Sequence, residues 1–198
     1  YDALDLCLEC KACKAECPSN VDMAKLKYEF LARHNDTNGT PLRSLIFAHV
    51  HRLNRAASWW PGAANRMIES PTLRRFLELT IGIDARRRLP AFAEETFETW
   101  FRKRSGKITG GDASVGRVVL FHDTFMNFNH PEIGRATTQL LEAAGYEVQL
   151  ADRVCCGRPM ISKGLAETAR THAAHNVREL LEWVDRGYTI VGCEPSCI

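Results

Sequence analysis

The sequence of 198 residues contains no run of about 20 apolar residues, the length that a helix needs to cross a bilayer, so no transmembrane helix is expected. It begins without the basic segment and short apolar core of a secretory signal, so export is not expected either. The first residue is Tyr1 rather than Met, and the last residues stop within a cysteine motif, so we expect a piece of a longer chain. Hydrophobic residues make up 45% and charged residues 25%, which is typical of a soluble globular protein with one or two domains.

The sequence also lacks a DNA-binding motif and an aromatic platform for stacking bases, although its middle is basic. Residues 41–107 hold 13 Lys or Arg against 6 Asp or Glu, and the segments on either side are acidic. Such a segment suits an anionic membrane surface or an acidic partner domain, and a solvated helical face is the simpler interpretation. Nucleic acid is not expected as a partner. Trp59 and Trp60, beside this segment, are expected in the core rather than at an interface.

Cysteine is abundant, with eight residues in two groups of four. Neighbouring cysteines two or three residues apart rarely have disulfide geometry, but they suit a shared metal centre. Without an export signal, the sequence therefore predicts metal or cluster ligands in a reducing compartment rather than a disulfide framework.

The first group has the spacing C-x2-C-x2-C-x3-C-P, and its members are Cys7, Cys10, Cys13 and Cys17. This is the bacterial ferredoxin run, in which the first three thiolates bind one 4Fe–4S cluster and the fourth binds the other cluster of a two-cluster module. Zinc is the alternative, but zinc sites favour two separated cysteine pairs. The companion half of the module is expected upstream, so residues 1–40 alone are not expected to hold two complete clusters.

The chain after the glycine-rich linker at 105–114 has a strand and helix pattern. Strands are expected at 117–121, 146–150 and 188–191, with helices at 131–144 and 162–185 between them. This β-α-β-α-β order predicts an α/β domain with a parallel sheet. Before the linker the pattern is helical, with helices expected at 21–31, 42–60 and 91–104 and a loop at 35–41.

The second cysteine group lies in this α/β domain. Its members are Cys155 and Cys156, followed by Gly157, and Cys193 and Cys197 near the end of the sequence. Both pairs follow strands, and ligands of parallel sheets gather beyond the carboxyl ends of strands. These cysteines are therefore predicted metal ligands, with two buried small apolar pairs as the plainer alternative.

These motifs resemble the cysteine-rich domain of heterodisulfide reductase and of the iron–sulfur subunits of glycolate, lactate and glycerol-3-phosphate oxidoreductases. They resemble still more closely bacterial proteins that fuse a flavin-linked oxidase, a two-cluster ferredoxin module and this domain, as in D-lactate and D-2-hydroxyglutarate dehydrogenases. The matching segments are residues 4–13, residues 21–24, Asp123-Thr124-Phe125, residues 131–136, residues 155–159 and Glu194-Pro195-Ser196-Cys197.

The resemblance implies three parts in this chain. Residues 1–40 would be the second half of a two-cluster ferredoxin-type module, residues 41–112 a basic helical connector, and residues 113–198 a first, truncated repeat of the cysteine-rich domain. It also implies FAD on an upstream flavin domain, which is absent here together with the catalytic residues, so no catalytic residue is assigned.

The sequence departs from the fuller cysteine-rich pattern at two places. His122 and Asp123 stand where that pattern has an early cysteine, and Glu194 stands where its terminal Cys-x2-Cys begins. A five-thiolate cluster is therefore in question. Either fewer thiolates hold a cluster, with help from His122 or Asp123, or the domain is a docking platform without one.

The leading functional hypothesis is the electron-transfer portion of a flavin-dependent D-2-hydroxyacid dehydrogenase, which passes electrons from FAD to a quinone or an electron-transfer protein. One alternative is a separate iron–sulfur subunit of a glycolate, glycerol-3-phosphate or heterodisulfide-type complex, and the non-enzyme alternative is a zinc-stabilised interaction module. We expect a cytoplasmic protein, with Arg86–Arg88 and Arg102–Arg104 as candidates for peripheral contact with the inner face of the membrane.

Overall fold

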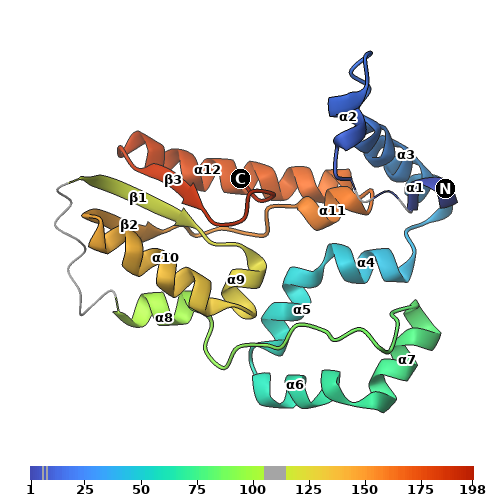
Figure 1. The fold of residues 1–198 in the computed structure, drawn as a ribbon, viewed down its shortest axis with the longest axis horizontal. Coiled ribbons are helices and arrows are strands. Elements are labelled where there is room, and N and C mark those ends of the chain that lie inside the picture. Colours follow the sequence, from blue (N-terminus) through green and yellow to red (C-terminus); the bar gives the residue numbers. More distant parts are fainter. Residues whose placement is uncertain (6, 8, 105–114) are drawn as a thin grey trace. The chain divides into compact units, whose positions relative to one another are not determined.

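A computed structural model describes residues 1–5, 7, 9–104 and 115–198, although not the side chains of Asp2 and Asp5. The chain divides into two compact units, and each unit combines separate stretches of sequence. Unit 1 comprises residues 1–50 and 157–171, and unit 2 comprises residues 51–156 and 172–198. The expected linker at 105–114 lies outside the described residues. The order of the elements is shown in Figure 1.

Unit 1 is helical within the described residues. Its elements are α1 (Asp2–Asp5), α2 (Ala12–Glu16), α3 (Met23–Asn38), α4 (Leu42–Ala48), α11 (Arg158–Ser162) and the first residues of α12 (Ala166–Asp185). A small core of Ala48, Met160 and Ala169 joins α4, α11 and α12, with Ile161 and Leu165 packed beside it. This core explains why a stretch after residue 157 belongs with the first 50 residues.

Unit 2 contains the sheet. Its helices are α5 (Val50–Ala57), α6 (Pro61–Glu69), α7 (Pro71–Ile81), α8 (Phe97–Arg104), α9 (Thr124–Phe128), α10 (Pro131–Ala143) and the rest of α12. The strands β1 (Gly116–Phe121), β2 (Tyr146–Leu150) and β3 (Thr189–Gly192) form a parallel sheet in the order β2-β1-β3. The predicted parallel α/β domain is therefore confirmed, whereas the ferredoxin-type character of residues 1–40 stays a prediction.

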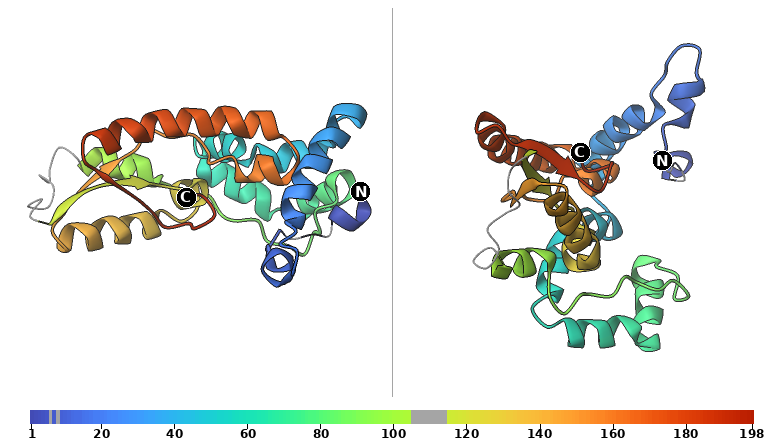
Figure 2. Two further views of the ribbon diagram at one scale, coloured as in Figure 1. Left: turned by 90° about the horizontal axis from the view of Figure 1, so that it is seen from above. Right: turned by 60° about the vertical axis from the view of Figure 1, so that its left-hand side comes forward.

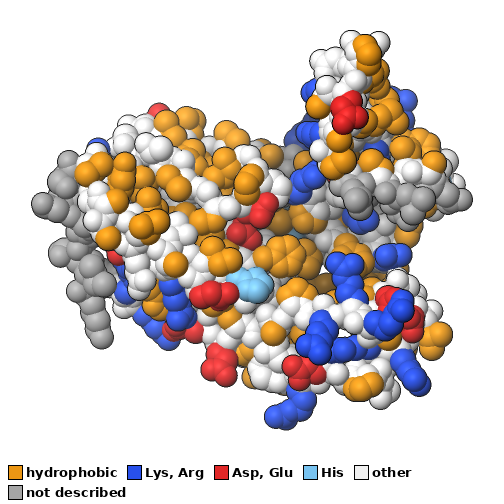
Figure 3. All heavy atoms as spheres, in the orientation of Figure 1, with side chains coloured by type: hydrophobic (Ala, Val, Ile, Leu, Met, Phe, Trp, Pro, Cys, Tyr) orange, Lys and Arg blue, Asp and Glu red, His pale blue; other side chains and the backbone are white. Residues whose placement is uncertain are grey.

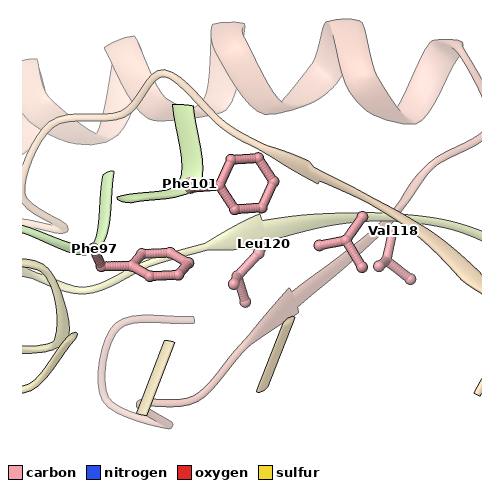
Figure 4. Packing of buried hydrophobic residues seen from close by; sticks show 5 residues of the cluster. Phe97, Phe101, Val118 and Leu120 are labelled. Atoms are coloured by element: carbon pink, nitrogen blue, oxygen red, sulfur yellow. The ribbon is translucent and has the colours of Figure 1, made fainter. Parts of the chain in front are cut away.

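The two faces of the sheet are covered by different helices, because successive side chains of β1 point to opposite faces. Val118 and Leu120 pack on one face with Phe97 and Phe101 of α8, as Figure 4 shows, and Leu141 of α10 joins this core. On the other face, Val119 packs with Ala151 and Tyr188, and Leu180 and Trp183 of α12 lie beside them. Figure 2 shows α10 and α12 on opposite sides of the sheet.

The structure corrects the expected loop at 35–41. Helix α3 continues to Asn38 and ends at Gly39, whose φ is 81°. Asn35 is 8% exposed, and its side-chain amide donates a hydrogen bond to the carbonyl of Lys163 at 2.9 Å. Contact with a residue 128 positions away therefore overrides the loop-like local composition, because tertiary packing outweighs weak helix propensity.

The long helices expected at 42–60, 91–104 and 162–185 are each interrupted or shortened. The first divides between α4 and α5 at His49, and the last divides at Gly164, whose φ is 74°. Helix α8 begins only at Phe97, because the segment before it is held against other residues: the N–H of Ala93 donates to the Phe128 carbonyl, and the Asn129 amide donates to the Ala91 carbonyl.

The two adjacent tryptophans are also placed differently from the expectation. Trp59 is 70% exposed and Trp60 is 72% exposed, so the prediction that they lie in the core is wrong. Their rings contact each other edge to face, with centroids 6.4 Å apart. No helix of the described residues is long and apolar enough to cross a membrane.

Candidate metal centre

The first cysteine group lies at the beginning of unit 1, around the short helix α2. Cys7 and Cys10 precede this helix, Cys13 lies within it, and Cys17 is the residue that ends it. Cys10 and Cys13 are exposed, and Cys7 and Cys17 are partly buried; all four are free thiols. The described geometry therefore keeps all four sulfurs unbridged on one short stretch of chain.

The backbone of this loop is tightly curled. Glu9, Lys11 and Asn20 have positive φ values of 57°, 61° and 53°. A left-handed conformation is uncommon for residues other than glycine and costs about 1 kcal/mol or more at each position, so it persists only where other contacts enforce it. Glu9 and Lys11 stand on either side of Cys10, so the strain is concentrated at the cysteine motif.

Backbone donors are directed at the last thiol of the motif. The N–H groups of Val21 and, to a smaller extent, Ser19 and Asn20 hydrogen-bond to the sulfur of Cys17 and lower the pKa of this thiol below its ordinary value. Hydrogen bonds to the charged form favour that form. The donor set around Cys17 thus fits a thiolate ligand of a metal or an iron–sulfur cluster, since the thiolate is the form that binds metal.

A buried ion network holds the loop in place. The side chain of Glu9 is 3% exposed, and its carboxylate lies 3.2 Å from Nζ of Lys27 and 3.1 Å from Nη1 of Arg158. Ser162 donates a further hydrogen bond to Glu9 at 3.0 Å, and Lys27 also donates to the carbonyl of Cys7 at 2.8 Å. Glu9 therefore ties the cysteine loop to α3 and to α11.

Tyr28 completes this network from the side of α3. Its hydroxyl oxygen accepts a hydrogen bond from Nη1 of Arg158 at 3.0 Å. Burial, the largest effect, raises the pKa of Tyr28, so the hydroxyl stays neutral at physiological pH. The network thus contains two cations, Lys27 and Arg158, and one anion, Glu9, which are close in space but distant in sequence.

The second cysteine group lies in unit 2, beyond the carboxyl ends of the strands. Cys155 is 4% exposed, Cys156 and Cys197 are partly buried, and Cys193 is exposed. The thiol of Cys156 donates a hydrogen bond to the sulfur of Cys197 at 3.2 Å, which lowers the pKa of Cys197 below its ordinary value. The structure therefore brings one cysteine from each pair together, as the topology predicted.

Cys193 has a different neighbour. Its sulfur lies 3.2 Å from the hydroxyl oxygen of Thr137 on α10, in hydrogen-bond contact. Among the described residues, no group of three or more His, Cys, Asp and Glu side chains has the arrangement of a metal site. The assignment of all eight cysteines as ligands therefore stays a prediction.

The chain before the second group is fixed by side chains of α12. The side-chain amide of Asn176, which is 6% exposed, accepts a hydrogen bond from the N–H of Val154 at 2.9 Å and donates one to its carbonyl at 3.2 Å. Nδ1 of His172 lies 3.0 Å from the carbonyl oxygen of Cys155 and, because a carbonyl only accepts, donates a hydrogen bond to it. Helix α12 thus positions the backbone at Val154 and Cys155.

Replacing Asn176 by Leu is expected to loosen this segment without unfolding the sheet. The change removes two hydrogen bonds to Val154, each worth about 1 kcal/mol, and leaves a buried N–H and carbonyl unpaired. Amide hydrogen exchange should therefore accelerate at Val154 while the amides of β1 stay protected. Asn129→Leu, which removes a comparable amide elsewhere in unit 2, is the matched control; equal acceleration at Val154 in both variants would contradict the assigned role.

Three residues stand at the two places where the sequence departs from the fuller cysteine pattern, and two of them stabilise local turns here. Oδ1 of Asp123 accepts hydrogen bonds from the N–H groups of Phe125 and Met126, so this carboxylate caps α9. Oε1 of Glu194 accepts from the backbone N–H and the hydroxyl of Ser196 and stabilises the turn between Cys193 and Cys197. His122 is 3% exposed, and burial, reinforced by the charge of Arg153, lowers its pKa well below the ordinary value.

Reasoning from the sequence alone did not find the Glu9 network or the anchoring role of Asn176. Glu9 and Arg158 both lie inside motifs, but nothing in the spacing of those motifs says that residues 149 positions apart form an ion pair. The signal in the sequence was Glu9 itself, a carboxylate between Cys7 and Cys10. If such a carboxylate is buried, it needs a cation as its partner.

The fold and the cysteine pattern together define an α/β domain of the cysteine-rich class. Residues 119–198 match the family model described as "CCG: Cysteine-rich domain". The resemblance derived from the motifs is therefore confirmed.

The curated relatives extend the likeness over nearly the whole chain. The chain is 30% identical over 183 residues to a protein named as one subunit of anaerobic glycerol-3-phosphate dehydrogenase in Escherichia coli K12, covering 91% of the chain and 45% of the relative. It is 26% identical over 205 residues to D-2-hydroxyglutarate dehydrogenase of Pseudomonas putida, covering 99% and 20%. It is 30% identical over 114 residues to one subunit of fumarate reductase (CoM/CoB) of Methanothermobacter marburgensis, covering 56% and 23%.

The chain spans less than half the length of these relatives. No solved structure matches it significantly. These relatives are named as oxidoreductases, so the chain is homologous to proteins of that functional class.

Proposed function

We propose that this chain is the iron–sulfur electron-transfer part of a flavin-dependent dehydrogenase. The observation that carries the proposal is the C-x2-C-x2-C-x3-C-P run, held as four free thiols on a strained loop that a buried ion network anchors. The family match of residues 119–198 and the dehydrogenase names of two relatives support it.

The residues that would hold the first cluster are Cys7, Cys10 and Cys13, with Cys17 serving a second one. A 4Fe–4S cluster supplies a one-electron carrier when bound. The backbone N–H groups around Cys17 stabilise its thiolate, and hydrogen bonds to cluster sulfurs and burial are the means by which a protein sets the reduction potential. Glu9 anchors the loop that carries these thiols to α3 and α11.

The second cysteine group has a less complete set of ligands. Cys156 and Cys197 are in sulfur–sulfur contact, Cys155 is buried beside them in the chain, and Cys193 contacts Thr137. These residues would hold a further centre if Cys155 and Cys193 turn towards the Cys156–Cys197 pair. Without that change, the domain serves as a docking platform for the electron acceptor.

The remaining parts of the proposal concern the whole protein. We propose an upstream flavin domain and first half of the ferredoxin module, a 2-hydroxy acid as the electron donor, and a quinone or electron-transfer protein as the acceptor. The second candidate, favoured by the 30% identity to a relative that is named as one part of a dehydrogenase complex, is a separate iron–sulfur subunit that acts beside a flavin subunit. FAD measured per polypeptide separates the two: about one FAD on the same polypeptide supports the fused form.

Contact with a membrane stays a prediction for the basic segment, as does the cytoplasmic location. Membrane contact is supported by exposed apolar side chains on α6, on α7 and in the turn before α6. The side chains that are more than half exposed are Trp59, Trp60, Met67, Phe76 and Leu79. Figure 3 shows lysine and arginine side chains in the region of α6 and α7 on the face in view. Exposed aromatic and basic side chains together are typical of interfacial helices.

The proposal is tested by measuring iron and acid-labile sulfide in anaerobically purified protein. Cys10→Ala is expected to remove about one cluster's worth of iron, since a 4Fe–4S cluster needs four ligands. Cys155→Ala and Cys197→Ala test the second group: a similar loss assigns a centre to that group, and unchanged iron assigns it the docking role.

Glu167→Gln, an exposed change in unit 1, serves as the control for handling losses. A parent protein that contains zinc and no iron would refute the electron-transfer proposal and favour an interaction module. Loss of iron in every variant including the control would indicate unspecific damage, and the measurement would then be repeated on variants reconstituted with iron and sulfide.

A further inference from the structure

Unit 2 contains a cavity of about 380 Å³ beside Cys155. It is lined by α5, by α9 with the end of β1, by the loop after β2, and by His172 of α12. All of its lining residues belong to unit 2. Its volume lies within the usual range for small-molecule sites, which is about 300–1,000 Å³.

The charge of the lining is predominantly positive. Arg52, Arg55 and Arg153 line the cavity, and Glu98 is the only acidic residue among the described lining side chains. The carboxylate of Glu98 is already paired, since Nη2 of Arg102 lies 2.7 Å from its Oε1. The lining therefore holds more cationic than anionic side chains, which favours a negatively charged occupant.

Two buried polar atoms in the same lining have no hydrogen-bond partner among the described residues. They are Nδ1 of His122, whose side chain is almost entirely buried, and Nε of Arg153. Leaving a buried polar atom unpaired costs about 1–3 kcal/mol, so such atoms are rare unless a ligand or ordered water completes them. Both atoms belong to residues at the carboxyl ends of strands, where ligands of parallel sheets bind.

Packing holds these groups in place. The guanidinium of Arg153 lies 5.8 Å from the ring centroid of Phe121, and the ring of His122 contacts that of Phe97 at 5.8 Å. These contacts restrict the orientations that both side chains can adopt. The apolar part of the lining includes Trp59 and Phe128, which offer aromatic surface to the body of a ligand.

From these observations we propose that this cavity binds a small organic acid, with its carboxylate held by Arg153 and by the arginines of α5, and its apolar body against Trp59 and Phe128. Guanidinium groups bind carboxylates through paired charge-assisted hydrogen bonds, which are stronger than neutral ones. Cys155 also lines the cavity, so the occupant would lie beside a predicted cluster ligand. The position beside a cluster rests on the proposed electron-transfer function, whereas the binding of the acid does not.

The test uses benzoate as the probe and benzamide as a neutral molecule of the same shape. Isothermal titration of the purified protein at constant ionic strength should detect benzoate and give at least about tenfold weaker binding of benzamide. Arg55→Gln, an exposed change, should weaken benzoate binding by about tenfold or more, and Arg153→Gln by more than that. Arg178→Gln, on the exposed face of α12, is the matched control and should leave the affinity unchanged.

Two outcomes would overturn the proposal. Equal affinities for benzoate and benzamide would show that charge does not select the occupant, and equal weakening by Arg55→Gln and Arg178→Gln would show only a general effect of net charge. Because Arg153 is half-buried and packs against Phe121, its variant is first checked by circular dichroism, and the conclusion rests on Arg55→Gln if that variant unfolds. Iron content is measured in the same samples, so that loss of the anion site and loss of a cluster are distinguished.

Discussion

Replacing Glu9 by Gln is expected to lower the free energy of unfolding by about 3–5 kcal/mol, although the two side chains have nearly the same shape. The carboxylate of Glu9 lies among Lys27, Arg158 and the hydroxyl of Ser162, and the side chain of Lys27 is only 5% exposed. Without its anion, this buried ammonium group loses its counter-charge in a place from which water is largely excluded. The change is measured by urea unfolding followed by circular dichroism.

Two further variants separate this effect from a general loss of charge. Glu16→Gln removes a carboxylate from the exposed side of α2 and should change the stability by no more than about 0.5 kcal/mol. The double variant Glu9→Gln, Lys27→Met removes the buried cation together with its partner, and should recover a substantial part of the lost stability, since replacing both members of a buried pair is often neutral. A cost below about 1 kcal/mol for Glu9→Gln would contradict the anchoring role of the network.

Truncation of Phe97 to Ala is expected to destabilise unit 2 by about 3–5 kcal/mol, the usual range for a buried phenylalanine. Phe97 is 0% exposed and contacts the rings of Trp100, Phe101 and His122. The helix α10 approaches it so closely that a Cβ atom on Gly134 would lie 2.6 Å from the Phe97 ring. Thermal unfolding monitored by circular dichroism gives the loss of stability.

The control is Phe125→Ala, because Phe125 is 45% exposed and its loss should cost much less. The close approach of Gly134 supplies a second test. Gly134→Ala should destabilise the parent by about 1–3 kcal/mol through overpacking, and should be tolerated once Phe97 is Ala, because the space is then free. Equal effects of Gly134→Ala in both backgrounds would show that the two residues do not contact each other in solution.

The sequence alone was sufficient for features that depend on local spacing. The alternation of strands and helices after residue 115 predicted the parallel sheet, because apolar periodicity and the proline and glycine at the ends of α10 act over a few residues. The same topology predicted that both cysteine pairs lie beyond the carboxyl ends of the strands, and there Cys156 contacts Cys197.

Features that depend on contacts between distant residues could not be predicted in this way. The extension of α3 through Asn35 depends on the carbonyl of Lys163, and the anchoring of Glu9 depends on Arg158. Trp59 and Trp60 were expected in the core because large aromatic side chains usually are, but the sequence contains no information on which elements would cover them. The positive cavity likewise combines residues from α5, α9 and the loop after β2.

The discontinuity of unit 1 limits how this protein can be divided or recombined. Helix α11 directly follows the Cys155-Cys156-Gly157 sequence, yet its Arg158 and Ser162 hold the carboxylate of Glu9 in the first cysteine loop. If the cysteine-rich domain were transferred to another protein, the first cysteine loop would lose the contacts of Glu9 with Arg158 and Ser162. A recombinant protein that keeps the first cysteine loop in this conformation therefore also needs α11, although α11 comes about 150 residues later in the chain.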